Sequence, residues 1–225
     1  MKSLNLTSWI IVAIFSVSSL PAAFAAPNIL DGVAIDIRGG TLGGGAEINY
    51  AINSKFTVGL GFNRFTYDTT QTVDDIDYNT ELKLQTISLL ASFHPFDGVF
   101  RLTGGIMNNG NQLSLTASPN LEYTIGDKTY TAAQVGTLDA SIKFNTLAPY
   151  FGLGWGLSAD TGFGVTLDIG ILFQGAPKVE MKANGLIADN SDFLADLQRE
   201  ETKAEDDISA FTMYPVVALG LEYRF

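Results

Sequence analysis

The chain contains no cysteine, a single histidine and few charged residues. Without cysteine it can form no disulfide, thiol nucleophile or zinc–thiolate site. Charged residues make up 16% of the chain, whereas soluble domains carry about 25%. There are 13 basic residues against 24 acidic ones, and this balance argues against nucleic-acid binding, which needs a basic face. The composition therefore leaves a charge-poor protein whose many short alternating segments suit one β domain.

Only the N-terminus carries an apolar run of the kind that targets a protein. Lys2 precedes a mostly apolar segment from Trp9 to Leu20, and Ala23-Phe24-Ala25 has the small-x-small pattern of a cleavage site. The apolar segment is too short to span a bilayer as a helix. We therefore expect a signal peptide over residues 1–25, removed near Ala25, and one domain over residues 26–225.

The last residues of the chain alternate between apolar side chains and small or charged ones. Val217, Leu219, Leu221, Tyr223 and Phe225 fall on one face of an extended strand. A terminal Phe with a second aromatic residue two positions earlier resembles the assembly signal of bacterial outer-membrane β-barrels. We therefore expect Leu219, Leu221, Tyr223 and Phe225 to be read by the barrel assembly machinery, and this strand to close a barrel.

The same period of two marks further strands along the chain. The expected strands cover residues 33–38, 46–52, 56–62, 87–93, 100–106, a segment ending at 155, 163–174 and 216–225. Short turns near Asn53, Pro95 and Ala159 alternate with long polar connections, including Thr69–Asn79 and Ser118–Thr137. Transmembrane barrels have this asymmetry, with short turns on the periplasmic side and long loops outside. The pattern predicts an all-β protein, a transmembrane antiparallel up-and-down β-barrel of about eight strands.

The glycine-rich stretch from Gly39 to Gly45 decides the strand count. If it were a kink inside one long strand, the count would be odd and the termini would lie on opposite sides of the membrane. A tight turn there gives an even count and places both termini in the periplasm, and we expect this arrangement. The alternation also slips between Phe62 and Phe65 and again around 143–147, which indicates bulges or strand portions that rise above the membrane.

The last long loop has the pattern of a short extracellular helix. Phe193, Leu194, Leu197, Ala204 and Ile208 have helical spacing, and Asn190 or Ser191 can cap the helix. Eight acidic residues lie between positions 189 and 207, with two basic ones. The pattern fits a solvated helix resting on the barrel rim; the functional alternatives are a lid or a divalent-cation bridge to lipopolysaccharide phosphates.

If the apolar face of each strand meets lipid, the other face points into the barrel. The predicted lumen-facing charges are Asp36, Arg38, Glu47, Arg101, Asp168, Glu222 and Arg224. An eight-stranded barrel is only wide enough for its own side chains, and unpaired buried charges are unfavourable. We expect these residues to pair as a plug; the alternative is that they line a path for solutes.

An enzymatic function has weaker support. Ser92 and His94 share a predicted face, a pair similar to that of lipid-modifying barrel esterases. However, Pro95 and a turn follow His94, which places it at the periplasmic rim with no evident acid to orient it. We expect no catalytic residues, no cofactor and no bound metal, and the barrel esterase is kept as a remote alternative.

Three short segments resemble the carbapenem-resistance-associated (CarO-type) outer-membrane proteins. They are Gly126–Tyr130, Leu147–Gly154 and Gly175–Glu180, followed by an acidic helical loop and the strand start Tyr214-Pro215-Val216. The resemblance implies an eight-stranded barrel, proposed to pass small polar solutes such as basic amino acids, whose interior can be closed at rest. It transfers no specificity residue, and the OmpW-like barrels are the neighbouring alternative.

Together these patterns predict a non-enzymatic integral protein of the outer membrane of a Gram-negative-type cell. Its function would be slow passage of small polar solutes through a narrow or plugged lumen. The alternative is a purely structural or surface barrel that contacts lipopolysaccharide. The expected partners are outer-membrane lipids and lipopolysaccharide, the barrel assembly machinery during insertion and small polar solutes, with no nucleic acid.

Overall fold

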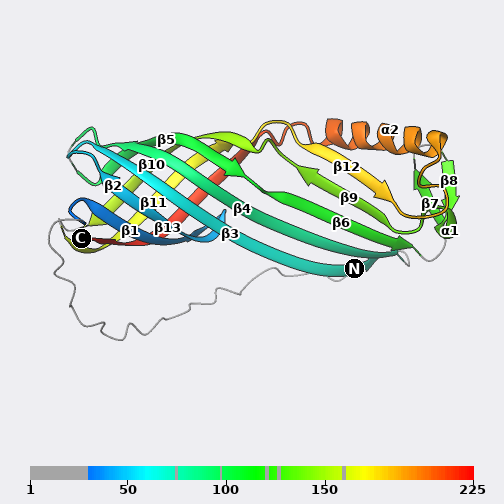
Figure 1. The fold of residues 1–225 in the computed structure, drawn as a ribbon, viewed down its shortest axis with the longest axis horizontal. Coiled ribbons are helices and arrows are strands. Elements are labelled where there is room, and N and C mark those ends of the chain that lie inside the picture. The colour runs from blue at the N-terminus through cyan, green and yellow to red at the C-terminus, as the bar shows by residue number, and fades with distance from the viewer. Residues whose placement is uncertain (1–29, 74–75, 97, 120–121, 126–127, 159–160) are drawn as a thin grey trace, which may run out of the picture. The chain divides into compact units, whose positions relative to one another are not determined.

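The structure, a computed structural model, describes residues 30–73, 76–96, 98–119, 122–125, 128–158 and 161–225 (Figure 1). The expected signal peptide, Asp74, Asp75 and Gly126-Asp127 lie outside these residues. The strands of the main sheet are β1 (Val33–Gly40), β2 (Gly43–Ala51), β3 (Phe56–Val73), β4 (Ile76–Phe93), β5 (Phe100–Asn109), β6 (Gln112–Pro119), β9 (Leu138–Lys143), β10 (Leu147–Ser158), β11 (Gly162–Phe173), β12 (Lys178–Ala183) and β13 (Met213–Arg224). The hairpin β7 (Glu122–Ile125) and β8 (Lys128–Thr131) and the helices α1 (Ala132–Val135) and α2 (Ser191–Asp207) complete the described elements.

Eight of the described strands close into an antiparallel barrel. Their order is β4-β3-β2-β1-β13-β11-β10-β5, and β5 pairs back onto β4. The last strand β13 joins β1 to β11, pairing Ile35 with Tyr223 on one side and Phe163 with Tyr223 on the other. The predicted fold class and the role of the last strand in closing the barrel are thus confirmed.

The glycine-rich stretch forms a tight turn, which confirms the even strand count. β1 ends at Gly40, the turn consists of Thr41 and Leu42, and β2 begins at Gly43. Gly43 has φ +94°, a left-handed conformation that favours glycine. Its position also allows no side chain, because a Cβ there would lie 2.6 Å from the Arg64 carbonyl oxygen.

The two faces of the barrel wall differ as the period of two predicts. Ile37, Ile48, Leu60 and Leu89 are exposed on the outer face, whereas Asp36, next to Ile37, is fully buried. Aromatic rings meet at the short-turn end, where Phe163, Tyr223 and Phe225 form two edge contacts with centroids 4.9 Å apart. An apolar outer band flanked by aromatic residues is typical of transmembrane barrels.

Five strands continue beyond the barrel as an open sheet, which we call the extension. In this sheet the outer halves of β3 and β4 are followed by β6, β9 and β12. The expected loop Thr69–Asn79 is therefore wrong: Thr70 pairs with Asn79 within a hairpin that reaches Val73 and Ile76. The expected loop Ser118–Thr137 is likewise replaced in part by β7, β8 and α1. The slips at Phe62–Phe65 and 143–147 fall where the barrel wall passes into the extension.

The polarity of the two faces inverts at this passage. On β4 the outer-face residues change from Leu89 and Ile87 to Lys83 and Glu81, while Leu84 on the inner face is buried. On β9 and β12 the outer face likewise carries Lys143 and Lys178. An outer face that changes from apolar to charged on neighbouring strands marks the level at which its surroundings change from lipid to water.

The acidic helix α2 lies along the free edge of the extension (Figure 1). Asn190 caps its N-terminus by accepting from the Asp192 and Phe193 amides, as predicted. Phe193 and Leu197 are buried in a cluster with Val135 and Ile125. Glu205 accepts from the Val179 amide at 2.9 Å and Glu201 from the Met181 amide at 2.5 Å. These carboxylates therefore satisfy backbone groups that edge strand β12 would otherwise leave unpaired. Within the described part of the chain, neither helix is long and apolar enough to cross a bilayer.

Candidate functional site: the barrel interior

On the inner face of the barrel, charged residues lie beside glycines of the adjacent strands. The space above these glycines is occupied by the neighbouring charged side chains. Arg101 on β5, Gly154 on β10 and Asp168 on β11 are direct neighbours across three strands. A Cβ on Gly154 would lie 2.5 Å from both Arg101 Nε and Asp168 Oδ1. The two charged side chains therefore meet directly over the glycine, which an alanine would prevent.

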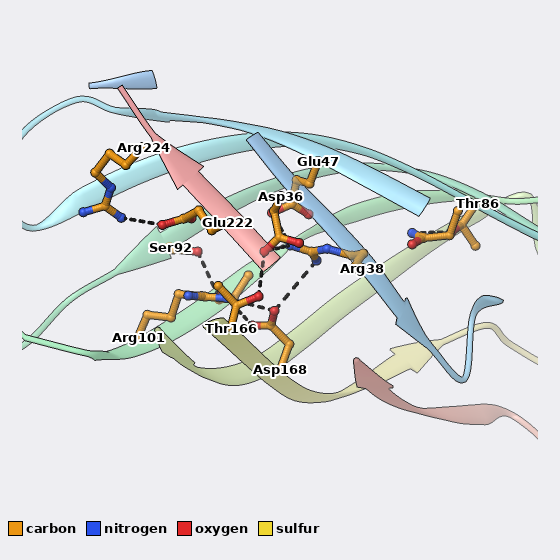
Figure 2. A network of polar contacts seen from close by, with 12 residues as sticks. Asp36, Arg38, Glu47, Thr86, Ser92, Arg101, Thr166, Asp168, Glu222 and Arg224 are labelled. Atoms are coloured by element: carbon orange, nitrogen blue, oxygen red, sulfur yellow. Dashed lines mark hydrogen bonds and ion pairs between the residues drawn. The ribbon is translucent and has the colours of Figure 1, made fainter. Parts of the chain in front are cut away.

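Asp168 is the centre of a charge network that crosses the barrel (Figure 2). Arg101 donates to both carboxylate oxygens of Asp168, at 2.7 and 2.8 Å, through one terminal nitrogen. Arg38 on β1 lies 3.8 Å from Asp168 and donates to Glu47 on β2 at 3.0 Å. Strand β13 separates β1 from β11 in the wall, so the Arg38–Asp168 contact spans the inside of the barrel.

Asp36 joins the same network from the neighbouring position on β1. Thr166 on β11 donates to Asp36 at 2.6 Å, and the Arg38 guanidinium lies 3.5 Å from the same carboxylate. Gly220 on β13 lies beneath this contact, since a Cβ there would be 2.2 Å from Asp36 Oδ1. Asp36 Oδ1 and Arg38 Nε are buried without a hydrogen-bond partner. The interior thus holds charges of both signs close together but does not satisfy every polar atom.

The remaining predicted charges lie nearer the short-turn end. Arg224 donates to Glu222 at 3.0 Å, and both line a vestibule of about 340 Å³ together with Asn53, His94 and Arg101. All seven predicted charges therefore belong either to the Asp168 network or to this vestibule. The vestibule ends where Arg101 and Glu47 enter the network.

A buried apolar layer, which the period of two does not predict, lies on the long-loop side of the charges. It consists of Leu42, Leu90, Met107, Ala148, Tyr150, Leu172 and Val216, with Tyr214 against it. Leu42 belongs to the β1–β2 turn, which Thr41 holds against β13. The Thr41 backbone carbonyl accepts from Tyr214 Oη at 2.6 Å, and the Thr41 hydroxyl donates to the Pro215 carbonyl at 3.0 Å. Between the two layers is a cavity of about 30 Å³, which is large enough to hold water.

Ser92 and His94 do not form the pair that the esterase alternative requires. Ser92 Oγ is 2.9 Å from Thr103 Oγ1, across the β4–β5 pair. The backbone amide of His94 donates to the Lys55 carbonyl at 2.8 Å, and its buried Nδ1 has no hydrogen-bond partner. Nothing in this geometry activates the serine. Among the described residues there is also no cluster of three or more His, Asp or Glu side chains that could hold a metal ion.

The four residues of the expected assembly signal lie on β13 and at its end. Leu219, Leu221 and Tyr223 are exposed on the outer face, and the backbone amide of Phe225 donates to the Val33 carbonyl at 3.1 Å. The terminal residue therefore pairs with the first barrel strand, next to the seam that closes the barrel.

Solved structures with this architecture include two proteins of Acinetobacter baumannii. The crystal structure of Acinetobacter baumannii CarO2 matches with a TM-score of 0.57 and 22% identity, covering 88% of this chain and all of that one. The chain has the CarO fold. A second structure, Acinetobacter baumannii CarO, matches with the same TM-score and coverage at 18% identity. No family model matches the chain, and neither does any curated protein sequence. The resemblance to CarO-type proteins is thus confirmed for the fold.

Proposed function

We propose that this protein is a non-enzymatic barrel of the outer membrane whose lumen is closed at rest. Slow passage of small polar solutes would require the closing layers to rearrange. The exposed apolar band, the aromatic rings at one end and the CarO fold support the membrane location.

The observation that carries the proposal is the presence of two barriers in series. The Asp168 network links β1, β2, β5 and β11, and the apolar layer around Leu42 follows it toward the long loops. A hydrated ion would have to separate ion pairs in the first barrier and lose water in the second. Opposite charges about 4 Å apart attract by roughly 4 kcal/mol at an effective dielectric of 20, so the first barrier does not open without a compensating interaction.

Conductance of the purified protein in planar bilayers tests this proposal. We expect little steady conductance from the wild type. We also expect only a small increase from Asp168→Ala or Leu42→Ala alone, because the other barrier remains. The double variant should give a steady leak. Asp168→Ala should in addition lower the free energy of unfolding by about 3 kcal/mol or more, since it leaves two largely buried arginines without their shared partner.

The matched control is the double variant Asp139→Ala/Leu186→Ala. It removes the same two side-chain types outside the barrel. Asp139 lies on β9 of the extension and accepts from Thr116, and Leu186, between β12 and α2, is 86% exposed. This control should remain as silent as the wild type. A robust, cation-selective wild-type pore would refute the closed lumen and favour a working path along the same charges.

A further inference from the structure

The outer face of the extension carries a cluster of basic residues just beyond the apolar band. The sheet register places Lys83, Gln112, Lys143 and Lys178 side by side on β4, β6, β9 and β12. Arg64 on β3 faces Gln85, one step closer to the apolar band. We call Arg64, Lys83, Lys143 and Lys178 the basic belt. It holds four of the 13 basic residues of a chain whose net charge is −11.

The position of the belt matches the headgroup level of a membrane. Along β4 toward the extension, the last exposed apolar residue of the outer face is Ile87, and Lys83 lies four residues farther out, at a position before Ile87 in the chain. At about 3.4 Å per residue this is roughly 14 Å along the strand, or about 10 Å along the membrane normal for a strand tilted by about 40°. The polar zone outside the hydrocarbon core is about 5–8 Å thick on each side. Lys83 therefore lies in this zone when Ile87 is at least about 2 Å inside the core, and Arg64, beside Gln85, is only half as far from the level of Ile87.

The charges of the belt are poorly neutralised by the protein itself. Among the ion pairs of the described residues, only Lys143 of the belt takes part, donating to Glu180 at 3.0 Å. This contact holds the pKa of Glu180 below its usual range. Lys143 and Lys178 are direct cross-strand partners, and like charges in that position destabilise a sheet. An anion bound between them would remove this repulsion.

The order of charges along the strands distinguishes a membrane ligand from a dissolved one. Two residues farther from the apolar band the same face carries Asp68, Glu81 and Glu180. These carboxylates repel anions that approach from water. Anions that already lie at the membrane surface reach the basic belt from the other side, along the apolar band.

We propose that the basic belt binds the phosphate groups of the glycolipid in the outer leaflet, with Arg64, Lys83 and Lys178 as the principal contacts. This inference rests on the outer-membrane location given under the proposed function. It does not depend on whether the lumen conducts.

Native mass spectrometry of the full-length folded protein in detergent, titrated with diphosphorylated lipid A, tests the proposal. The test variant is Arg64→Gln/Lys83→Gln/Lys178→Gln, and the control Lys55→Gln/Lys182→Gln/Lys203→Gln removes as much charge elsewhere. We expect the test variant to bind about tenfold more weakly, as the loss of three exposed ionic contacts implies, and the control to stay within twofold of the wild type. Added salt should weaken wild-type binding by screening.

Three further arms identify the ligand and the role of charge. Dephosphorylated lipid A should bind the wild type no better than it binds the test variant. Inorganic phosphate at millimolar concentration should not displace lipid A. The variant Arg64→Lys/Lys83→Arg/Lys178→Arg should retain binding, and heat-modifiable migration on gels will show that each variant is folded. Equal affinity of the wild type for both forms of lipid A, or of the test and control variants for the phosphorylated form, would overturn the proposal.

Discussion

At the scale of single residues, the glycines of the inner face leave space for the charged side chains of the adjacent strands. Gly154 lies directly between Arg101 and Asp168, and Gly220 lies beneath Asp36 and Thr166. In so narrow a barrel the ion pairs cannot form over any larger residue. The glycines and the charges are therefore parts of one packing arrangement.

We predict that Gly154→Ala destabilises the folded barrel by about 1–3 kcal/mol, the usual penalty for overpacking. The new methyl group must displace the Arg101–Asp168 pair, since its Cβ would lie 2.5 Å from both side chains. Equilibrium unfolding in urea with lipid or detergent present measures the change.

Gly104→Ala on the adjacent strand β5 is the control. A Cβ there meets nothing closer than 3.8 Å, so it should be neutral or slightly stabilising through the unfolded chain. Equal destabilisation by the two substitutions would show that the space over Gly154 is not required.

Residue alternation predicted the inner charges from the sequence but not the inner apolar layer. Asp36 and Arg38 alternate with the apolar residues Ile35 and Ile37, so the sequence itself shows that the two charged residues share the face opposite the apolar ones. Leu90 follows Leu89, and Leu172 stands between Ile171 and Phe173. In such continuous apolar runs the period of two gives no signal. The face of Leu90 and Leu172 depends on the register set by the rest of the barrel.

At the scale of elements, α2 acts as a cover for a sheet edge. Its Glu201 and Glu205 are one helical turn apart and reach the amides of Met181 and Val179, which are two residues apart on β12. Hydrogen bonds to a charged acceptor are about twice as strong as neutral ones. The acidic character of this helix thus has a structural use that its amphipathic pattern alone did not reveal.

Glu201→Gln/Glu205→Gln should loosen the cover. We predict faster amide hydrogen exchange at Val179 and Met181, by about tenfold, because each neutral amide forms a weaker bond and the helix opens more often. The control Glu200→Gln/Asp206→Asn changes the same charge on the same helix and should leave these two amides protected. Unchanged exchange in the test variant would mean that apolar packing around Phe193 alone holds the helix.

The extension could not be predicted from the alternation rule that works for the barrel. Within the membrane the outer face is apolar, but beyond it Lys83 and Lys143 are outside and Leu84 and Ile142 are on the inner face. The rule therefore reverses at the rim. Polar residues such as Thr69 and Thr70 predict a loop, although both lie in a paired strand.

At the scale of the whole molecule, the short turns, the start of β1 and the end of β13 lie on one side of the barrel. The β2–β3 turn and the β4–β5 turn lie at this side, where Phe225 pairs with Val33. The extension and α2 lie at the other. With the arrangement expected for outer-membrane barrels, the extension faces the cell exterior.

The absence of native cysteine makes this orientation easy to test. A membrane-impermeant thiol reagent applied to intact cells should label Ala204→Cys on α2 but not Ser54→Cys in the β2–β3 turn. Both should be labelled after the outer membrane is permeabilised. Labelling of Ser54→Cys alone in intact cells would invert the orientation, and the basic belt would then face the inner leaflet.

The strands of the wall are of very unequal length. β3 and β4 have 18 residues each, whereas β1 has eight and β2 nine. Above the rim formed by β1 and β2, the inner-face residues Phe65 and Tyr67 remain 44% and 56% exposed. The two sides of the barrel rim therefore differ in height. On the side of β3 and β4 the sheet continues beyond the rim as the extension, and on the side of β1 and β2 the wall ends at the rim. In a crowded membrane, neighbouring proteins therefore contact either the tall side of the rim or the low side. The rotation of each molecule about the membrane normal decides which of the two sides a given neighbour contacts.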